Sequence, residues 1–96
     1  MARPELLNES EVQRRLAELP GWSGDSQRIR RSVALPAERL SALLGEVDRV
    51  QAELDHHAQI EQQDGGVTFV VWTHSAGGVT GLDFELALRI NAVIGG

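Results

Sequence analysis

A tight turn at Asp64-Gly65-Gly66 lies between two extended segments, and it constrains the fold more than any other feature. Asp-Gly accepts the positive φ angles that a two-residue hairpin turn requires. After the turn, the side chains of Val67 to His74 alternate in direction as in a strand, with Val67, Phe69 and Val71 on one face. Before the turn, Gln59 to Gln63 is predicted to be a second strand, with fewer apolar residues. The sequence therefore predicts an antiparallel hairpin over 59–74.

A second strand pair is expected earlier in the chain. Trp22 opens a short extended segment, and the turn residues at 23–26 reverse the chain. The following segment places Ile29, Val33 and Leu35 on one face and polar side chains on the other, which predicts a strand.

Two amphipathic stretches predict helices before and between these strand pairs. The first helix begins near Asn8, with Glu11 in capping-box spacing, and ends at Pro20-Gly21. The second begins after Pro36 and runs for roughly twenty residues, to His56 or His57. Its apolar stripe consists of Leu40, Leu43, Leu44, Val47, Val50 and Leu54.

A third helix is expected at the end of the chain. Thr80 opens it, with Asp83 in capping-box register. Its expected inner stripe consists of Leu82, Leu86, Ile90 and Val93. The predicted fold is therefore α+β, in the order α-β-β-α-β-β-α, with a four-stranded antiparallel sheet covered by helices on one face. A chain of 96 residues is expected to form a single domain over residues 1–96.

Composition excludes several classes of function. The net charge is -5 and the nine basic residues are all arginine without a long basic stripe, so no nucleic-acid partner is expected. The absence of cysteine excludes disulfides, thiolate zinc sites and cysteine nucleophiles. No apolar run approaches the ~18 residues of a membrane span. The polar, acidic segment 1–11 does not resemble a signal peptide, so a cytoplasmic protein is expected.

All three histidines lie in the second half of the chain, where predicted elements end. Histidine titrates near neutral pH, which suits acid–base chemistry. A metal site is disfavoured, because the adjacent side chains of His56 and His57 would point about 100° apart on a helix. Structural roles remain open: the pair at a helix C-terminus, His74 at a strand end, and Asp83 in its capping box. Trp22 and Trp72 are interpreted as core or interface residues.

The run Asp55-His56-His57, then Thr73-His74, Gly78-Val79-Thr80 and Asp83, resembles the signature of the pterin-4a-carbinolamine dehydratase family. Leu19-Pro20-Gly21-Trp22 is similar to the family's segment after the first helix, so the resemblance covers nearly the whole chain. It implies a hydro-lyase that dehydrates 4a-hydroxytetrahydropterin to quinonoid dihydropterin for pterin recycling, without metal or cofactor. It also implies a small-molecule pterin partner and a homodimer or homotetramer.

The resemblance also implies roles for individual residues. His56 and His57 would form the catalytic acid–base pair, and His74 would bind and polarise the pterin. Asp55, Asp83 and Thr73 would bind substrate, with either aspartate orienting an imidazole or meeting polar edges of the ring.

Four positions depart from the family pattern. Ala58 replaces the usual proline after the histidine pair, and Ile60 replaces an aromatic residue. Ala52 stands in place of an acid, and Asp64 stands where many members carry an aromatic residue. These departures keep two alternatives open. One is a non-catalytic dehydratase-like binding or assembly module, and the other is a dehydratase for a different pterin-like substrate.

Overall fold

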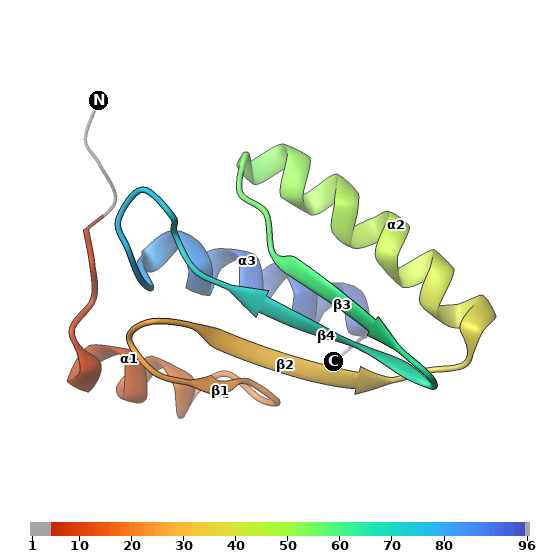
Figure 1. Ribbon diagram of the computed structural model, residues 1–96, viewed down its shortest axis with the longest axis horizontal. Helices are drawn as coiled ribbons and strands as arrows, with labels where there is room; N and C mark the ends of the chain where they lie inside the picture. Colours follow the sequence, from red (N-terminus) through yellow and green to blue (C-terminus); the bar gives the residue numbers. More distant parts are fainter. Residues whose placement is uncertain (1–4, 96) are drawn as a thin grey trace.

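The computed structural model describes residues 5–95 (Figure 1). Residues 1–4 of the polar N-terminal segment, and residue 96, lie outside this range. The elements are α1 (Glu9–Leu16), β1 (Ser23–Gly24), β2 (Ile29–Ala34), α2 (Ala37–Leu54), β3 (Gln59–Gln63), β4 (Gly66–Val71) and α3 (Gly81–Ile94). This order confirms the predicted α+β arrangement. Among the described residues, no helix is both long and apolar enough to cross a membrane.

The four strands form one antiparallel sheet in the order β1-β2-β4-β3. Strand β4 is central: Ile29 of β2 lies opposite its Val71, and Gln59 of β3 lies opposite its Val70. The two predicted hairpins are therefore joined edge to edge through β2 and β4.

The two faces of the sheet differ in how deeply their side chains are buried. On the inner face, Ile29, Val67, Phe69 and Val71 are fully buried, in one core cluster with residues from all three helices. On the opposite face, side chains such as Arg30 remain exposed. Alternation along each strand produces this division, so the helices cover one face, as the sequence predicts.

Helix α1 begins as expected, because the Asn8 side chain accepts a hydrogen bond from the Glu11 backbone N–H at 2.8 Å. The prediction that it continues to Pro20-Gly21 is wrong. The helix ends at Leu16, and the N–H groups of Glu18 and Leu19 bond to carbonyls three residues back, at 3.1 and 3.0 Å. The chain thus tightens into turns before the proline.

Helix α2 is shorter than predicted, because it ends at Leu54 and not at His56 or His57. Asp55 adopts a left-handed conformation with φ 51°, which aspartate tolerates better than most residues. The backbone N–H of His56 then bonds to the carbonyl of Gln51 at 3.1 Å. The histidine pair consequently lies in the connection to β3 and not on the helix.

Strand β4 is also shorter than predicted, since it ends at Val71 and leaves 72–74 outside the ladder. The Thr73 N–H bonds to the carbonyl of Gly78 at 2.9 Å, closing a tight turn in which Gly77 has a φ of 79°. His74 is the first residue inside this turn and is exposed.

Helix α3 has the predicted capping box between Thr80 and Asp83. Its expected inner stripe is only partly correct, because Leu82 is exposed in the first turn. Phe84, Leu86, Ala87 and Ile90 are the apolar residues that α3 buries. Asp83 is buried among them, so the face of the first turn that points inward carries the acid and not Leu82.

Candidate active site

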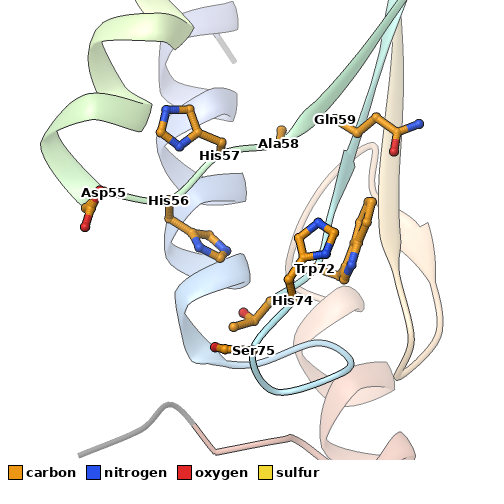
Figure 2. Close-up of a pocket in the computed structure, with 9 residues that line it drawn as sticks. Asp55, His56, His57, Ala58, Gln59, Trp72, His74 and Ser75 are labelled. Carbon is orange, nitrogen blue, oxygen red and sulfur yellow. The ribbon is translucent and has the colours of Figure 1, made fainter. Parts of the chain in front are cut away.

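A pocket of about 530 Å³ lies where the end of α2 and the end of β4 meet (Figure 2). It is lined by Asp55, His56, His57, Ala58, Gln59, Trp72, Thr73, His74 and Ser75. The fold therefore brings all three histidines to one cavity, together with Asp55 and Thr73. Asp83 is the one predicted site residue that does not line it.

His56 is the most firmly held of the three histidines. Its Nε2 lies 2.5 Å from Oδ1 of Asp83. The His56 side chain is 12% exposed, whereas Asp83 is fully buried behind it. His57 and His74 are both exposed. Asp83 therefore contacts the pocket through residues that line it, among them His56.

Asp83 is fixed by three segments of the chain. Besides His56, its Oδ2 accepts hydrogen bonds from the Thr73 hydroxyl and from the Thr80 backbone N–H, both at 2.8 Å. The Thr73 and Thr80 hydroxyl oxygens are also 2.8 Å apart. Because Thr73 donates its one proton to Asp83, Thr80 must donate to Thr73. Every member of this buried network then has a defined donor or acceptor role.

This network defines the tautomer of His56. Opposite an ionised carboxylate, which only accepts hydrogen bonds, the His56 Nε2 carries the proton of this contact. In the neutral ring, Nδ1 then carries the lone pair and is the nitrogen that can take up a proton. An imidazole oriented in this way by a buried acid is a recurrent arrangement in general acid–base sites.

Gln51 holds the histidine connection from behind, and the sequence analysis missed it. Its backbone carbonyl accepts from the His56 N–H at 3.1 Å, and its side-chain Oε1 accepts from the Ala58 N–H at 2.8 Å. The side chain is buried, at 4% exposed. Gln51 follows Val47 by four residues, so it is a polar residue in a buried helical position. A polar residue at a position where the helix pattern expects an apolar one is the signal by which the sequence could have identified Gln51.

Trp72, which the sequence analysis interprets as a core or interface residue, is half-buried and forms a wall of the pocket. Its ring lies 4.5 Å from the His74 ring, at an interplanar angle of 50°. The Arg28 guanidinium lies 4.5 Å from the centre of the same Trp72 ring, in cation–π contact. Trp22, by contrast, is buried as predicted and donates from Nε1 to Asn91 at 2.8 Å.

The chemistry available in the pocket is proton transfer between imidazoles and a bound polar molecule. Within residues 5–95, no cluster of three or more potential ligands is placed to hold a metal ion. No buried side-chain nitrogen or oxygen in that range lacks a hydrogen-bond partner. The buried polar groups behind the pocket are therefore hydrogen-bonded within the protein.

Fold and site together define a small α+β protein with a histidine-lined pocket backed by a buried carboxylate. The family model for pterin 4 alpha carbinolamine dehydratase matches residues 5–93. The chain belongs to the pterin-4a-carbinolamine dehydratase family, as its sequence motifs indicate.

Individual relatives agree with this assignment. A Streptomyces avermitilis protein, provisionally named pterin-4-alpha-carbinolamine dehydratase, is 47% identical over 90% of this chain and 87% of its own length. A Streptomyces coelicolor protein with the same provisional name is 45% identical over 96% and 93%. A Brucella melitensis crystal structure, described as a transcriptional coactivator/pterin dehydratase, superposes with a TM-score of 0.85. It is 30% identical and covers 91% of this chain and 96% of the other.

Proposed function

We propose that this protein dehydrates 4a-hydroxytetrahydropterin to quinonoid dihydropterin by histidine acid–base catalysis. One observation carries the proposal: His56, His57 and His74 line a single pocket in a chain that belongs to a family of pterin dehydratases. The pocket volume of about 530 Å³ suits a bicyclic ring with a short substituent.

The reaction needs two proton transfers. The C4a–O bond breaks as one histidine protonates the hydroxyl group, which leaves as water. A second histidine accepts the N5 proton, and the N5 electron pair forms the C4a–N5 double bond. One histidine gives up a proton and the other gains one, so the reaction consumes no co-reactant. We assign this exchange to His56 and His57, and the binding and polarisation of the pterin to His74.

The remaining predicted residues support the histidines. Thr73 and Asp83 hold His56 in one tautomer, which makes Asp83 a positioning residue in this proposal. Asp55 lies exposed at one end of the pocket, where its carboxylate can accept from the amino group and N3–H of the pterin. We further propose that the protein works in the cytoplasm, as a homodimer or homotetramer and without a bound cofactor.

A second candidate function comes from the Brucella melitensis neighbour, which is described as a transcriptional coactivator as well as a dehydratase. Under that alternative, this chain would bind a protein partner and the histidines would be structural. The altered positions Ala52, Ala58 and Ile60 are compatible with it. The hydrogen bond between His56 and the buried Asp83 favours catalysis, because it orients an imidazole that lines the pocket.

Stopped-flow absorbance with chemically generated 4a-hydroxytetrahydropterin tests the proposal. The wild type should accelerate dehydration, and His57→Ala and His74→Ala should each lose about 10²–10⁴-fold of that acceleration. Arg49→Ala, on the exposed surface of α2, is the control and should retain the wild-type rate. If wild type leaves the spontaneous rate unchanged, the dehydratase proposal fails and the partner-binding alternative takes its place.

A further inference from the structure

A second hollow adjoins the histidine pocket on the open face of the sheet. It has a volume of about 520 Å³, and its lining includes Arg28, Arg30, Gln59, Glu61 and Thr68. Gln59 lines both this hollow and the histidine pocket. A molecule bound beside the histidines therefore has a continuous path over Gln59 onto the sheet.

Strand register explains why two arginines border this path. Arg30 lies opposite Val70, and Val70 lies opposite Gln59, so the three side chains form a row across the open face. Arg28 precedes Arg30 by two residues and shares its face. Its guanidinium lies against Trp72, which itself lies against His74. Arg28 is thus separated from the catalytic pocket by one aromatic ring.

Both guanidinium groups are available to a ligand. Within residues 5–95, neither Arg28 nor Arg30 forms a side-chain hydrogen bond or an ion pair, and both are exposed. Arginine is well suited to phosphate and carboxylate, because its planar fork donates two parallel hydrogen bonds. The chain as a whole carries a net charge of -5, so two arginine side chains beside one pocket stand out from its overall negative charge.

Two acids lie near these arginines, because Glu61 lines the hollow and Asp25 is close enough to Arg28 and Arg30 to feel their charges. Asp25 accepts from the backbone N–H groups of Gln27 and Arg28, at 2.8 and 3.1 Å. Those hydrogen bonds are the main reason that the pKa of Asp25 is lowered, with a smaller contribution from the charges of Arg30 and Arg28. Glu61 accepts from the Gln59 side chain at 2.8 Å. Neither acid forms an ion pair with an arginine of the hollow.

The placement of the lining residues gives a direction to the bound ring. In Figure 2, Asp55 lies at one end of the pocket, and Trp72 and Gln59 lie at the other. With the amino and N3–H edge of a pterin at Asp55, the opposite edge, which bears the C6 substituent, points toward Trp72 and Gln59. That substituent then extends toward the two arginines.

From these observations we propose that the hollow binds an anionic group, a phosphate or a carboxylate, at the end of the substrate's C6 substituent. Arg28 and Arg30 are its ligands, and Gln59 marks the crossing between the two cavities. The substrate class is thereby narrowed to pterins with an acidic side chain. This inference rests on the proposed function, since it uses the pterin orientation described above.

Calorimetric titration with stable dihydropterins tests the inference separately from catalysis. The probes are dihydroneopterin, its monophosphate, and an analogue with a carboxylate at the same chain length. We expect wild type to bind at least one anionic probe about tenfold more tightly than the neutral one, with a smaller preference in high salt. The phosphate and carboxylate arms identify which anion is preferred.

The ratio of anionic to neutral affinity is the decisive quantity in the variants. Arg28→Gln and Arg30→Gln should each lower that ratio several-fold, whereas Arg49→Gln, remote on α2, should leave it unchanged. Equal affinities for neutral and anionic probes in wild type would overturn the inference while leaving dehydration of a neutral pterin intact. Failure of every pterin to bind, together with an unaccelerated stopped-flow reaction, would instead overturn the proposed function. A preference that survives in both arginine variants would also reject the hollow as the anion site.

Discussion

Asp83 is fully buried at the start of α3, yet it accepts hydrogen bonds from His56, from Thr73 and from the backbone of Thr80. Two of these donors belong to segments beyond α3, the connection after α2 and the turn after β4. A single carboxylate thus joins the two walls of the pocket. The same Asp83 side chain therefore caps α3 and contacts His56.

Replacing Asp83 by asparagine tests this arrangement. The introduced amide keeps the size of the side chain, but its NH₂ group must face either His56 or the two donors at Oδ2. Facing His56, it would donate to Nε2 and move the ring proton to Nδ1, which reverses the tautomer. We expect Asp83→Asn to lower kcat about 10²–10⁴-fold, with a stability loss of about 1–3 kcal/mol. Stopped-flow kinetics and urea unfolding measure the two effects.

Thr73→Val is the companion change, because it removes one donor to Asp83 without altering the acid. It should cost about 1–3 kcal/mol of stability and weaken activity less than Asp83→Asn does. If Asp83→Asn retains wild-type kcat while its pH–rate profile is unchanged, the tautomer of His56 is not set by Asp83.

At the residue scale, the sequence predicted which side chains would meet but not how they would face one another. The spacing of the histidine motifs was sufficient to place His56, His57 and His74 in one region. The cation–π contact between Arg28 and Trp72 depends on the pairing of β2 with β4. No local pattern encodes that pairing, because it joins segments about forty residues apart.

At the scale of elements, the connection between α2 and β3 decides where the histidines point. Gln51 accepts from the N–H groups on both sides of this short segment, one through its backbone and one through its side chain. The left-handed conformation of Asp55 makes the first contact possible. The family's usual proline at position 58 would have no N–H, so Ala58 creates a donor that Gln51 satisfies.

A double-mutant cycle tests whether Gln51 and Ala58 act as a pair. Gln51→Leu leaves the Ala58 N–H unpaired and should cost about 1–3 kcal/mol in unfolding free energy, with a fall in kcat. Adding Ala58→Pro removes the unpaired donor and stiffens the connection, so it should restore part of both losses. Urea denaturation and stopped-flow rates give the coupling energy. Additive effects of the two changes would contradict the pairing.

The middles of the elements were predictable, and their ends were less so. Apolar periodicity identified α2 and β4 because burial repeats over many residues in each. Both were predicted too long, since a single residue decides the end: Asp55 in the left-handed region and Thr73 in its bond to Gly78. Aspartate and threonine carry weaker stop signals than glycine or proline.

At the scale of the whole molecule, α1 is tied to the first hairpin by charged and polar side chains. Glu9 accepts from the Ser26 backbone N–H at 2.9 Å, and Gln13 donates to the Gly24 carbonyl at 3.0 Å. Hydrogen bonds from Gln13 and the Ser26 backbone lower the pKa of Glu9. This edge of the fold therefore depends on ionised carboxylates.

The dependence of stability on ionised carboxylates can be measured at Glu11. Hydrogen bonds from Arg14 and then Arg15 lower its pKa from 4.5 to about 2. A carboxyl whose pKa is depressed by folding stabilises the native state above its unfolded pKa, and this contribution is lost as the pH falls through the folded value. The stabilisation from Glu11 should thus be complete above about pH 4.5 and vanish near pH 2.

Glu11→Gln should flatten the fall in stability between pH 4.5 and 2, with little change in slope at neutral pH. The effect should be small and should shrink in high salt, because the ion pairs are exposed. Urea unfolding across this pH range measures it, with Glu85→Gln on the exposed side of α3 as the control. An acid limb as steep in Glu11→Gln as in wild type would place the acid sensitivity elsewhere.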